Sequence, residues 1–288
     1  MLVQSTNTGR VTVAYAEEGT GENVVLFVHG IPTDYRIWSS QLDGLSRDFR
    51  LISISRRHAF PNKNGDEILE STVENNSDDL VSFIGRLNLP KLNLVGHSYG
   101  GSVALYSAWK HPELFKSLVL VEPAVPSLLV KNEKSFLEVI AFLLRNPSAA
   151  ISARRFQSGE LKLALRAYRS GNFAGAVKHF VDGIKERKGA FEKLPQGIQN
   201  LMLDNSKTIG ELETEFPILD RADASKITIK TLLVKGEKSP GWLQAIVDNL
   251  SKSMPNSSLV EIPGSGHLPH IEKPAELNAA LLQFLRAR

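Results

Sequence analysis

The sequence predicts an α/β fold in which helices flank a mostly parallel central sheet. Two observations carry this prediction. Short apolar runs, typical of strands buried on both faces, alternate with stretches whose apolar residues recur at helical spacing. The alternation occupies both ends of the chain and is interrupted once, by a long segment with helical periodicity alone.

The strands and helices of the first part follow from local patterns. Apolar runs predict strands at 11–16, 24–28, 51–54, 92–95 and 117–121. The stretch 77–87 predicts a helix, since its apolar residues recur on one helical face. A second helix at 103–109 ends at His111-Pro112, because the residue before a proline disfavours helical geometry.

The middle of the chain predicts a helical insertion. From about Pro126 to Asp220 no strong strand run appears, and an excursion of roughly 90 residues is too long for an ordinary loop. We therefore expect an all-helical cap (residues 125–220) inserted into a core domain formed by residues 1–124 and 221–288. Because the insertion follows a strand, it should cover the carboxyl ends of the strands, where ligands bind in such sheets. Strand and helix patterns then alternate again. Strands are expected at 228–234 and 258–262, and helices at 242–250 and 275–285.

The predicted cap is basic. Residues 125–195 hold 13 Lys and Arg against 6 Asp and Glu, a net charge of +7, which leaves −4 on the rest of the chain. A solvated helical face is the favoured interpretation, and a cap that attracts an anionic substrate, such as a carboxylate or a CoA ester, is the alternative. We expect the apolar residues of the cap to pack against one another more than to line a pocket. These residues are Phe136, Ile140, Leu143, Leu144, Phe156 and Tyr168.

Composition excludes several classes of function. The 288 residues are 42% hydrophobic and 23% charged and include no cysteine, which excludes disulfides, a catalytic thiol, thiolate-bound zinc and iron–sulfur clusters. The net charge of +3 is too small to predict a nucleic-acid partner. No stretch reaches the ~18 uninterrupted apolar residues of a membrane span, and residues 1–10 do not resemble a signal peptide. We therefore expect a cytoplasmic protein without a membrane partner; a homodimer stays open.

The candidate nucleophile is Ser98. It lies in Gly96-His97-Ser98-Tyr99-Gly100, which matches the G-x-S-x-G pattern between an expected strand and a helix starting near Gly101. A serine on so tight a turn has a strained backbone, and the flanking glycines let the chain pass without a clash. The helix N-terminus behind it favours a developing negative charge. A plain glycine-rich turn is the alternative interpretation.

Two backbone amides are predicted to bind the oxyanion. One is the N–H of Tyr99, directly after the candidate nucleophile. The second is expected in His29-Gly30-Ile31-Pro32, which follows the strand 24–28. Pro32 has no N–H, so we assign this role to Ile31.

The candidate general base is His267. It lies in a glycine-rich loop, Pro263-Gly264-Ser265-Gly266-His267, between a strand and the last helix, and the glycines allow the loop to present the ring to Ser98. His270, three residues further on, is the alternative. His29 and His97 flank glycine or serine in turns and are expected to be structural.

Taken together, these motifs resemble the α/β-hydrolase superfamily, in particular its serine hydrolases with a helical cap. The motifs are His-Gly-Ile-Pro at 29–32, Gly-His-Ser-Tyr-Gly at 96–100 and Gly-Ser-Gly-His at 264–267, which span nearly the whole length outside the insertion. The resemblance implies an α/β-hydrolase fold and a hydrolytic enzyme that needs no metal or organic cofactor.

The catalytic acid departs from the commonest pattern of this superfamily. Many relatives carry Gly-x-x-Asp where this chain has Gly236-Glu237-Lys238-Ser239, and a serine cannot stabilise an imidazolium as a carboxylate does. Haloalkane-dehalogenase-like and zearalenone-lactonase-like members place the acid after the strand that follows the nucleophile helix. This resemblance implies Glu122, directly after the strand 117–121. Glu237 is the alternative acid, and a more distant one such as Asp248 stays open.

A second departure follows the strand 51–54. Many relatives have Asp-x-x-Gly-x-Gly-x-Ser there, whereas this chain has Ser55-Arg56-Arg57-His58-Ala59-Phe60-Pro61-Asn62. Because this loop differs from that of many relatives, their substrates do not predict the substrate of this chain. We expect Arg56 and Arg57 to pair with acids of the core rather than to bind substrate.

The predicted function is that of a serine hydrolase acting on a small-molecule carboxylic ester or lactone. Ser98 would attack the acyl carbon, His267 would take its proton, and Glu122 would orient and stabilise the histidine, with an acyl-enzyme as the intermediate. A serine nucleophile disfavours epoxide hydrolase and haloalkane dehalogenase chemistry, which need a carboxylate nucleophile. Carbon–carbon bond hydrolysis, acyl transfer, cofactor-free lyase or oxygenase chemistry, and a weakly catalytic ligand-binding relative stay open.

Overall fold

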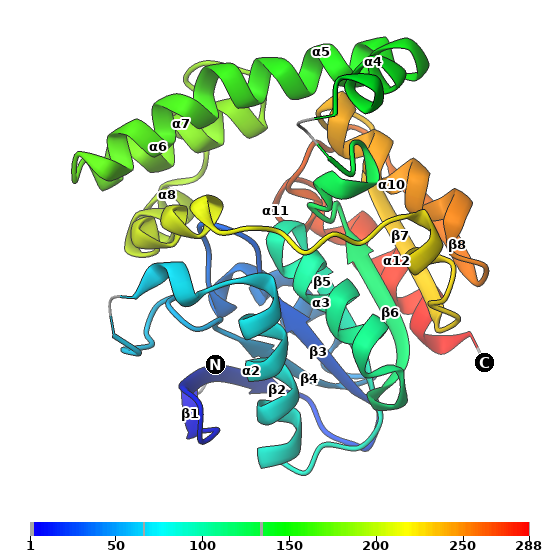
Figure 1. Ribbon diagram of the computed structural model, residues 1–288. Coiled ribbons are helices and arrows are strands. Elements are labelled where there is room, and N and C mark those ends of the chain that lie inside the picture. The colour runs from blue at the N-terminus through cyan, green and yellow to red at the C-terminus, as the bar shows by residue number, and fades with distance from the viewer. Residues whose placement is uncertain (1–2, 66, 133–134, 288) are drawn as a thin grey trace.

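A computed structural model describes residues 3–65, 67–132 and 135–287. An eight-stranded sheet in the order β1-β2-β4-β3-β5-β6-β7-β8 forms its centre (Figure 1). β1 pairs with β2, and β2 with β4, in antiparallel register, whereas the strands from β4 to β8 are parallel. The strands are β1 (Val3–Asn7), β2 (Thr12–Glu18), β3 (Val24–Val28), β4 (Arg50–Ile54), β5 (Leu92–His97), β6 (Phe115–Val121), β7 (Lys230–Gly236) and β8 (Ser257–Ile262).

Helices cover both faces of this sheet, which explains why its central strands are continuously apolar. Every residue of β3 is buried. Val24, Leu26 and Val28 belong to one core cluster, together with side chains of α2 (Val73–Arg86), α3 (Ser98–Lys110) and α10 (Gly241–Ser253). Val25 and Phe27 belong to the opposite cluster, with side chains of α1 (Ser39–Leu45) and α12 (Pro274–Arg286). The predicted fold class is confirmed.

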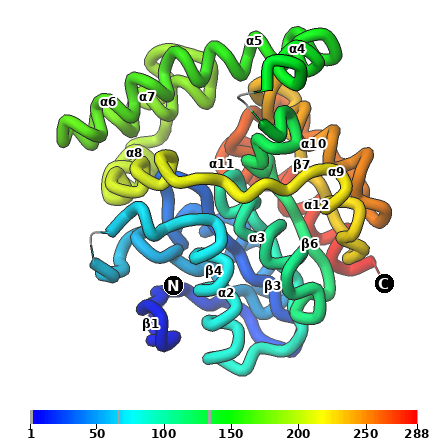
Figure 2. Tube along the Cα trace, in the orientation of Figure 1, coloured from blue at the N-terminus to red at the C-terminus, as the bar shows by residue number. Residues whose placement is uncertain are grey.

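Helical structure fills the chain between β6 and β7, where the described residues contain no strand. The elements are the short 3-10 helix η4 (Pro126–Leu128), α4 (Phe136–Arg145), α5 (Pro147–Arg155), the π-helical turn η5 (Phe156–Leu161), α6 (Lys162–Arg169), α7 (Phe173–Ile184), η6 (Phe191–Lys193), α8 (Gln196–Asp204), η7 (Ser206–Glu213) and α9 (Arg221–Ala224). Figures 1 and 2 show α4–α7 above the ends toward which the parallel strands run. The division into a core and a cap at residues 125 and 220 stays a prediction.

Among the described residues, no single helix is both long enough and apolar enough to cross a bilayer. Only α4 and the segment Pro147–Arg169, bent by 119° at their junction, qualify together by length and composition.

Two arginines that follow β4 have different partners. Arg57 pairs with Asp79 of α2 at 2.9 Å, as expected of an arginine that supports the core. The expectation was wrong for Arg56, whose Nη1 lies 2.7 Å from Glu211 Oε2 in η7, inside the predicted cap. β4 ends at the edge of the sheet that the cap covers, so a residue after it meets the cap. Both side chains are buried, and the pair joins the two parts of the chain.

Removal of Glu211 should destabilise the protein far more than removal of Glu213, two residues further along η7. Glu211→Ala leaves the buried Arg56 guanidinium without its counter-charge, which typically costs about 3–5 kcal/mol. Glu213 pairs with the exposed Arg169, and such surface pairs contribute about 0–1 kcal/mol. Urea unfolding of the two alanine variants measures the difference, and equal losses would contradict the role of this ion pair.

Candidate active site

The turn between β5 and α3 holds Ser98 in a strained conformation. Ser98 is the first residue of α3 and has φ = +52°, a region that non-glycine residues rarely adopt. A Cβ at Gly100 would lie 2.3 Å from the carbonyl oxygen of His29, and a Cβ at Gly96 would lie 2.4 Å from the carbonyl oxygen of Gly100. Both contacts are too close for any side chain, so the flanking glycines are what allow this turn to pack against the strand next to it.

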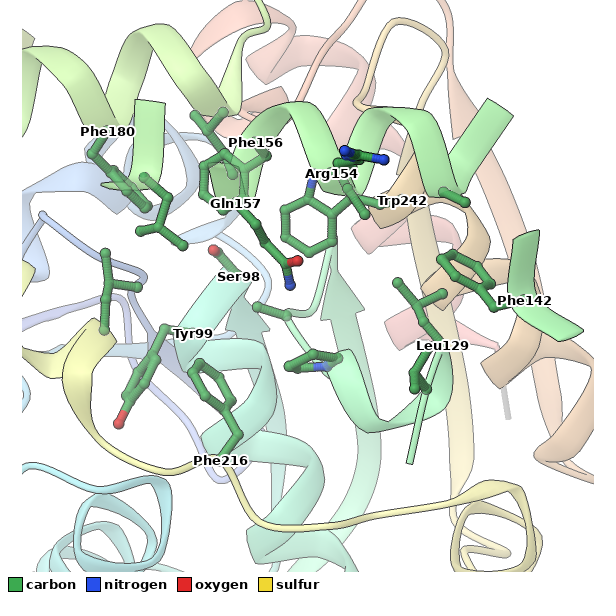
Figure 3. Close-up of a pocket in the computed structure, with 18 of the residues that line it drawn as sticks. Ser98, Tyr99, Leu129, Phe142, Arg154, Phe156, Gln157, Phe180, Phe216 and Trp242 are labelled. Atoms are coloured by element: carbon green, nitrogen blue, oxygen red, sulfur yellow. The ribbon is translucent and has the colours of Figure 1, made fainter. Parts of the chain in front are cut away.

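A cavity of about 430 Å³ lies between this turn and the helices above it (Figure 3). Its walls are mainly apolar, and the labelled aromatic side chains are Tyr99, Phe142, Phe156, Phe180, Phe216 and Trp242. Phe156 stacks on Trp242 with ring centroids 5.3 Å apart. Ser98 lies at the floor, while Arg154 and Gln157 of the overlying helices contribute polar groups. The cavity is therefore a mainly apolar space with the Ser98 hydroxyl at its floor.

The apolar residues of the predicted cap divide into three groups. Phe156 and Leu143 line the cavity, and Tyr168 packs against the core cluster. Phe136 and Leu144, in contrast, project into solvent. The expectation that such residues mainly pack inside the cap is therefore wrong for these two helical positions of α4.

The two predicted oxyanion donors line the cavity beside Ser98. Tyr99 is the second residue of α3, and the first four N–H groups of a helix have no acceptor within it. The loop that carries Ile31 touches the nucleophile turn, because a Cβ at Gly30 would lie 2.9 Å from the Ser98 Cβ. The residues that carry the two predicted amides thus lie beside Ser98.

His29 fixes this loop from behind, as expected of a structural histidine. Its Nε2 accepts the backbone N–H of Arg56 at 3.0 Å, so the proton of the neutral ring is on Nδ1, which donates to the Gly30 carbonyl at 2.8 Å. The Arg56 guanidinium donates to the His29 carbonyl at 3.0 Å. Complete burial and the neighbouring Arg56 hold the pKa of His29 well below its usual range.

The side chains of Glu122 and His267 are in contact. The Oε2 of Glu122 lies 3.3 Å from Nδ1 of His267, and both side chains are buried. The second carboxylate oxygen accepts the backbone N–H of Gly236 at 2.6 Å, at the end of β7. Within the described ranges, the Ser98 hydroxyl forms no hydrogen bond with His267. The structure thus brings the predicted acid and base together, without a hydrogen bond between the base and the predicted nucleophile among the described residues.

The alternative acids and the alternative base lie elsewhere. Glu237 accepts the backbone N–H of Gly264 at 2.6 Å, and Asp248 pairs with Lys235 at 3.1 Å. In the described part of the chain, neither carboxylate forms a hydrogen bond with His267. The ring nitrogens of His270 are buried and have no hydrogen-bond partner there either.

The pKa values of the buried pair are shifted in opposite directions. Burial raises the pKa of Glu122 to about 8, against the lowering effects of the Gly236 amide, the Ser239 hydroxyl and Lys235. Burial also lowers the pKa of His267 to about 3. His267 is therefore neutral near pH 7 and free to accept a proton, which is the state that a general base requires.

Two residues position the histidine loop: Glu272, which carries no signal in the sequence, and His97, which was expected to be structural. Glu272 accepts the backbone N–H of Gly266 at 2.6 Å and forms an ion pair with Lys185, which follows α7. The imidazole of His97 donates through Nε2 to the carbonyl of His267 at 2.8 Å. Glu272 raises the pKa of His267 and Lys185 lowers it, so the charges of Glu272 and Lys185 both act on the candidate base.

Comparison with known proteins gives consistent results. A family model described as "Alpha/beta hydrolase family" matches residues 25–280. Bifunctional epoxide hydrolase 2 of Rattus norvegicus is 22% identical over 96% of this chain and 54% of its own, so the chain spans about half of that relative's length. The 2-(acetamidomethylene)succinate hydrolase of Mesorhizobium japonicum is 25% identical over 97% of this chain and 93% of its own. A thermophilic esterase from Thermogutta terrifontis shares the fold, with a TM-score of 0.72 and 23% identity over 99% of this chain and 98% of that one.

Proposed function

The chain belongs to the alpha/beta hydrolase family and is a hydrolase, and from this premise we propose that it is a serine hydrolase of carboxylic esters or lactones. The observation that carries the proposal is the buried contact between Glu122 and His267, together with a cavity whose floor is Ser98. A carboxyl group bonded to a neutral histidine, combined with a strained serine, is the set of groups that activates a serine hydroxyl once the carboxyl is ionised.

The reaction follows from these positions. The Ser98 oxygen attacks the carbonyl carbon of the substrate while His267 accepts the hydroxyl proton through Nε2, and Glu122 stabilises the resulting imidazolium. The amides of Ile31 and Tyr99 bind the oxyanion. The tetrahedral intermediate expels the alcohol, which takes the proton from His267, and an acyl-enzyme remains. Water then repeats the two steps on this ester and releases the acid.

The cavity favours a substrate with an apolar acyl or alcohol part. Its volume of about 430 Å³ falls within the roughly 300–1,000 Å³ of small-molecule sites. A serine also separates this chain from its epoxide hydrolase relative, since opening an epoxide through an alkyl ester needs a carboxylate nucleophile. In a lactone the leaving alcohol stays tethered to the acyl group, so the same geometry serves esters and lactones.

Three substitutions test the assignment of roles. On p-nitrophenyl esters of increasing chain length and a lactone panel, Ser98→Ala should lower kcat by about 10⁴- to 10⁶-fold. At a pH above 8, where the wild-type Glu122 is ionised, Glu122→Gln should lower kcat by about 10⁴-fold, because the histidine loses its orienting charge. The matched control Glu237→Gln removes an exposed carboxylate and should change kcat by no more than about twofold. A larger loss in Glu237→Gln than in Glu122→Gln would overturn the acid assignment.

The pH profile of kcat/KM should reflect Glu122 rather than His267. With a pKa of about 3, His267 is already neutral at ordinary pH. Glu122, with a pKa of about 8, must lose its proton before its charge can stabilise the histidine cation, so kcat/KM should rise with pH with a midpoint near that value. Glu122→Gln cannot ionise and should abolish the rise. A variant that keeps the same midpoint would show that another group controls the profile.

A further inference from the structure

The outer surface of α4–α6 is unusually apolar. Seven of the 12 exposed large hydrophobic residues among those described lie on α4–α6, which form the outermost layer of helices in Figure 1. Leu137, Leu144 and Phe136 are exposed by 80%, 79% and 75%. A concentration of exposed apolar residues on one set of helices usually marks an interaction site. We call this surface the outer cap face; its apolar members used below are Phe136, Leu137, Ile140, Leu144, Ile151 and Leu163.

The geometry of α4 separates this face from the cavity. Phe136, Ile140 and Leu144 recur every four residues and so form one stripe along the helix. Val139 and Phe142 lie on the other side of the helix and line the cavity. No described residue of α4 is buried, and Phe136, Ile140 and Leu144 all count among the exposed large hydrophobic residues. The same short helix therefore joins the cavity wall to the exposed surface.

Unpaired cations accompany the apolar residues. Arg145, Arg155, Lys162 and Arg166 are exposed, and none forms an ion pair with a carboxylate that the structure describes. The acids on these helices are already engaged. Glu160 contacts His179 at 2.8 Å, and Glu138 accepts the backbone N–H of Asn132 at 2.9 Å. The outer cap face is thus both apolar and positively charged.

We infer that the outer cap face docks on an anionic phospholipid surface. Apolar side chains of an interfacial helix enter the region between headgroups and acyl chains, while arginine and lysine bind anionic headgroups. A second copy of this chain fits less well, because a two-fold symmetric contact would bring these unpaired cations against one another. The sequence led us to expect no membrane partner because no stretch spans a bilayer, but a helix that lies on the surface needs no spanning length.

This docking would also bring the cavity to the lipid. α4 and α5 each contribute to both surfaces, since Phe142 and Arg154 line the cavity while Leu144 and Ile151 are exposed. The inference does not depend on the proposed chemistry, because it concerns binding alone.

Vesicle flotation of the full chain tests the inference. The protein should float with vesicles of phosphatidylcholine and phosphatidylglycerol, should bind pure phosphatidylcholine much more weakly, and should be released from the mixed vesicles by high salt. Two double variants, Leu137→Glu/Leu144→Glu and Arg155→Glu/Arg166→Glu, should each lower the bound fraction at least about tenfold. The matched control Lys252→Glu/Leu259→Glu changes one exposed cation and one exposed apolar residue away from the cap and should bind as the wild type does.

Several outcomes would overturn the inference. They are no flotation with anionic vesicles, equal flotation with phosphatidylcholine alone, an equal loss in the control variant, or a solution dimer that Leu137→Glu/Leu144→Glu dissociates. Hydrolysis of a short, water-soluble ester should be unchanged in these surface variants. Docking without any esterase activity would refute the proposed function and leave the inference standing.

Discussion

The burial of the Glu122 carboxylate is the constraint on which the rest of the site depends. A carboxylate removed from water is costly unless its oxygens are bonded, and the partners available are the Gly236 amide and the His267 ring. These partners come from the end of β7 and from the loop after β8, so a single side chain at the end of β6 ties three neighbouring strand ends together. Such a meeting is possible because parallel strands end at one edge of the sheet.

Two ion pairs extend this coupling to the helices above the sheet. Arg56 and Glu211 lie behind the loop that carries Ile31, and Lys185 and Glu272 lie against the loop that carries His267. A displacement of the predicted cap would therefore move the oxyanion loop and the histidine loop together. The helices above the sheet are thus connected by ion pairs to both loops that carry reacting groups.

Local patterns in the sequence predicted the features that depend on local chemistry. The apolar runs revealed the buried strands, and the glycines around Ser98 revealed the strained turn. β1 and α1 escaped prediction because both are largely polar. Lys185–Glu272 and Arg56–Glu211 join residues 87 and 155 positions apart, so no local pattern reveals them. Periodicity identified α4 as an amphipathic helix, but it cannot tell whether the apolar face is covered.

In the proposed mechanism, Glu122 activates Ser98 through His267. The most direct measurement is the second-order rate of fluorophosphonate labelling, with peptide mass mapping of the adduct, in the wild type and in Glu122→Gln. We expect one adduct on Ser98 and a strongly reduced labelling rate in the variant. Labelling of another residue, or an unchanged rate in Glu122→Gln, would contradict the claim.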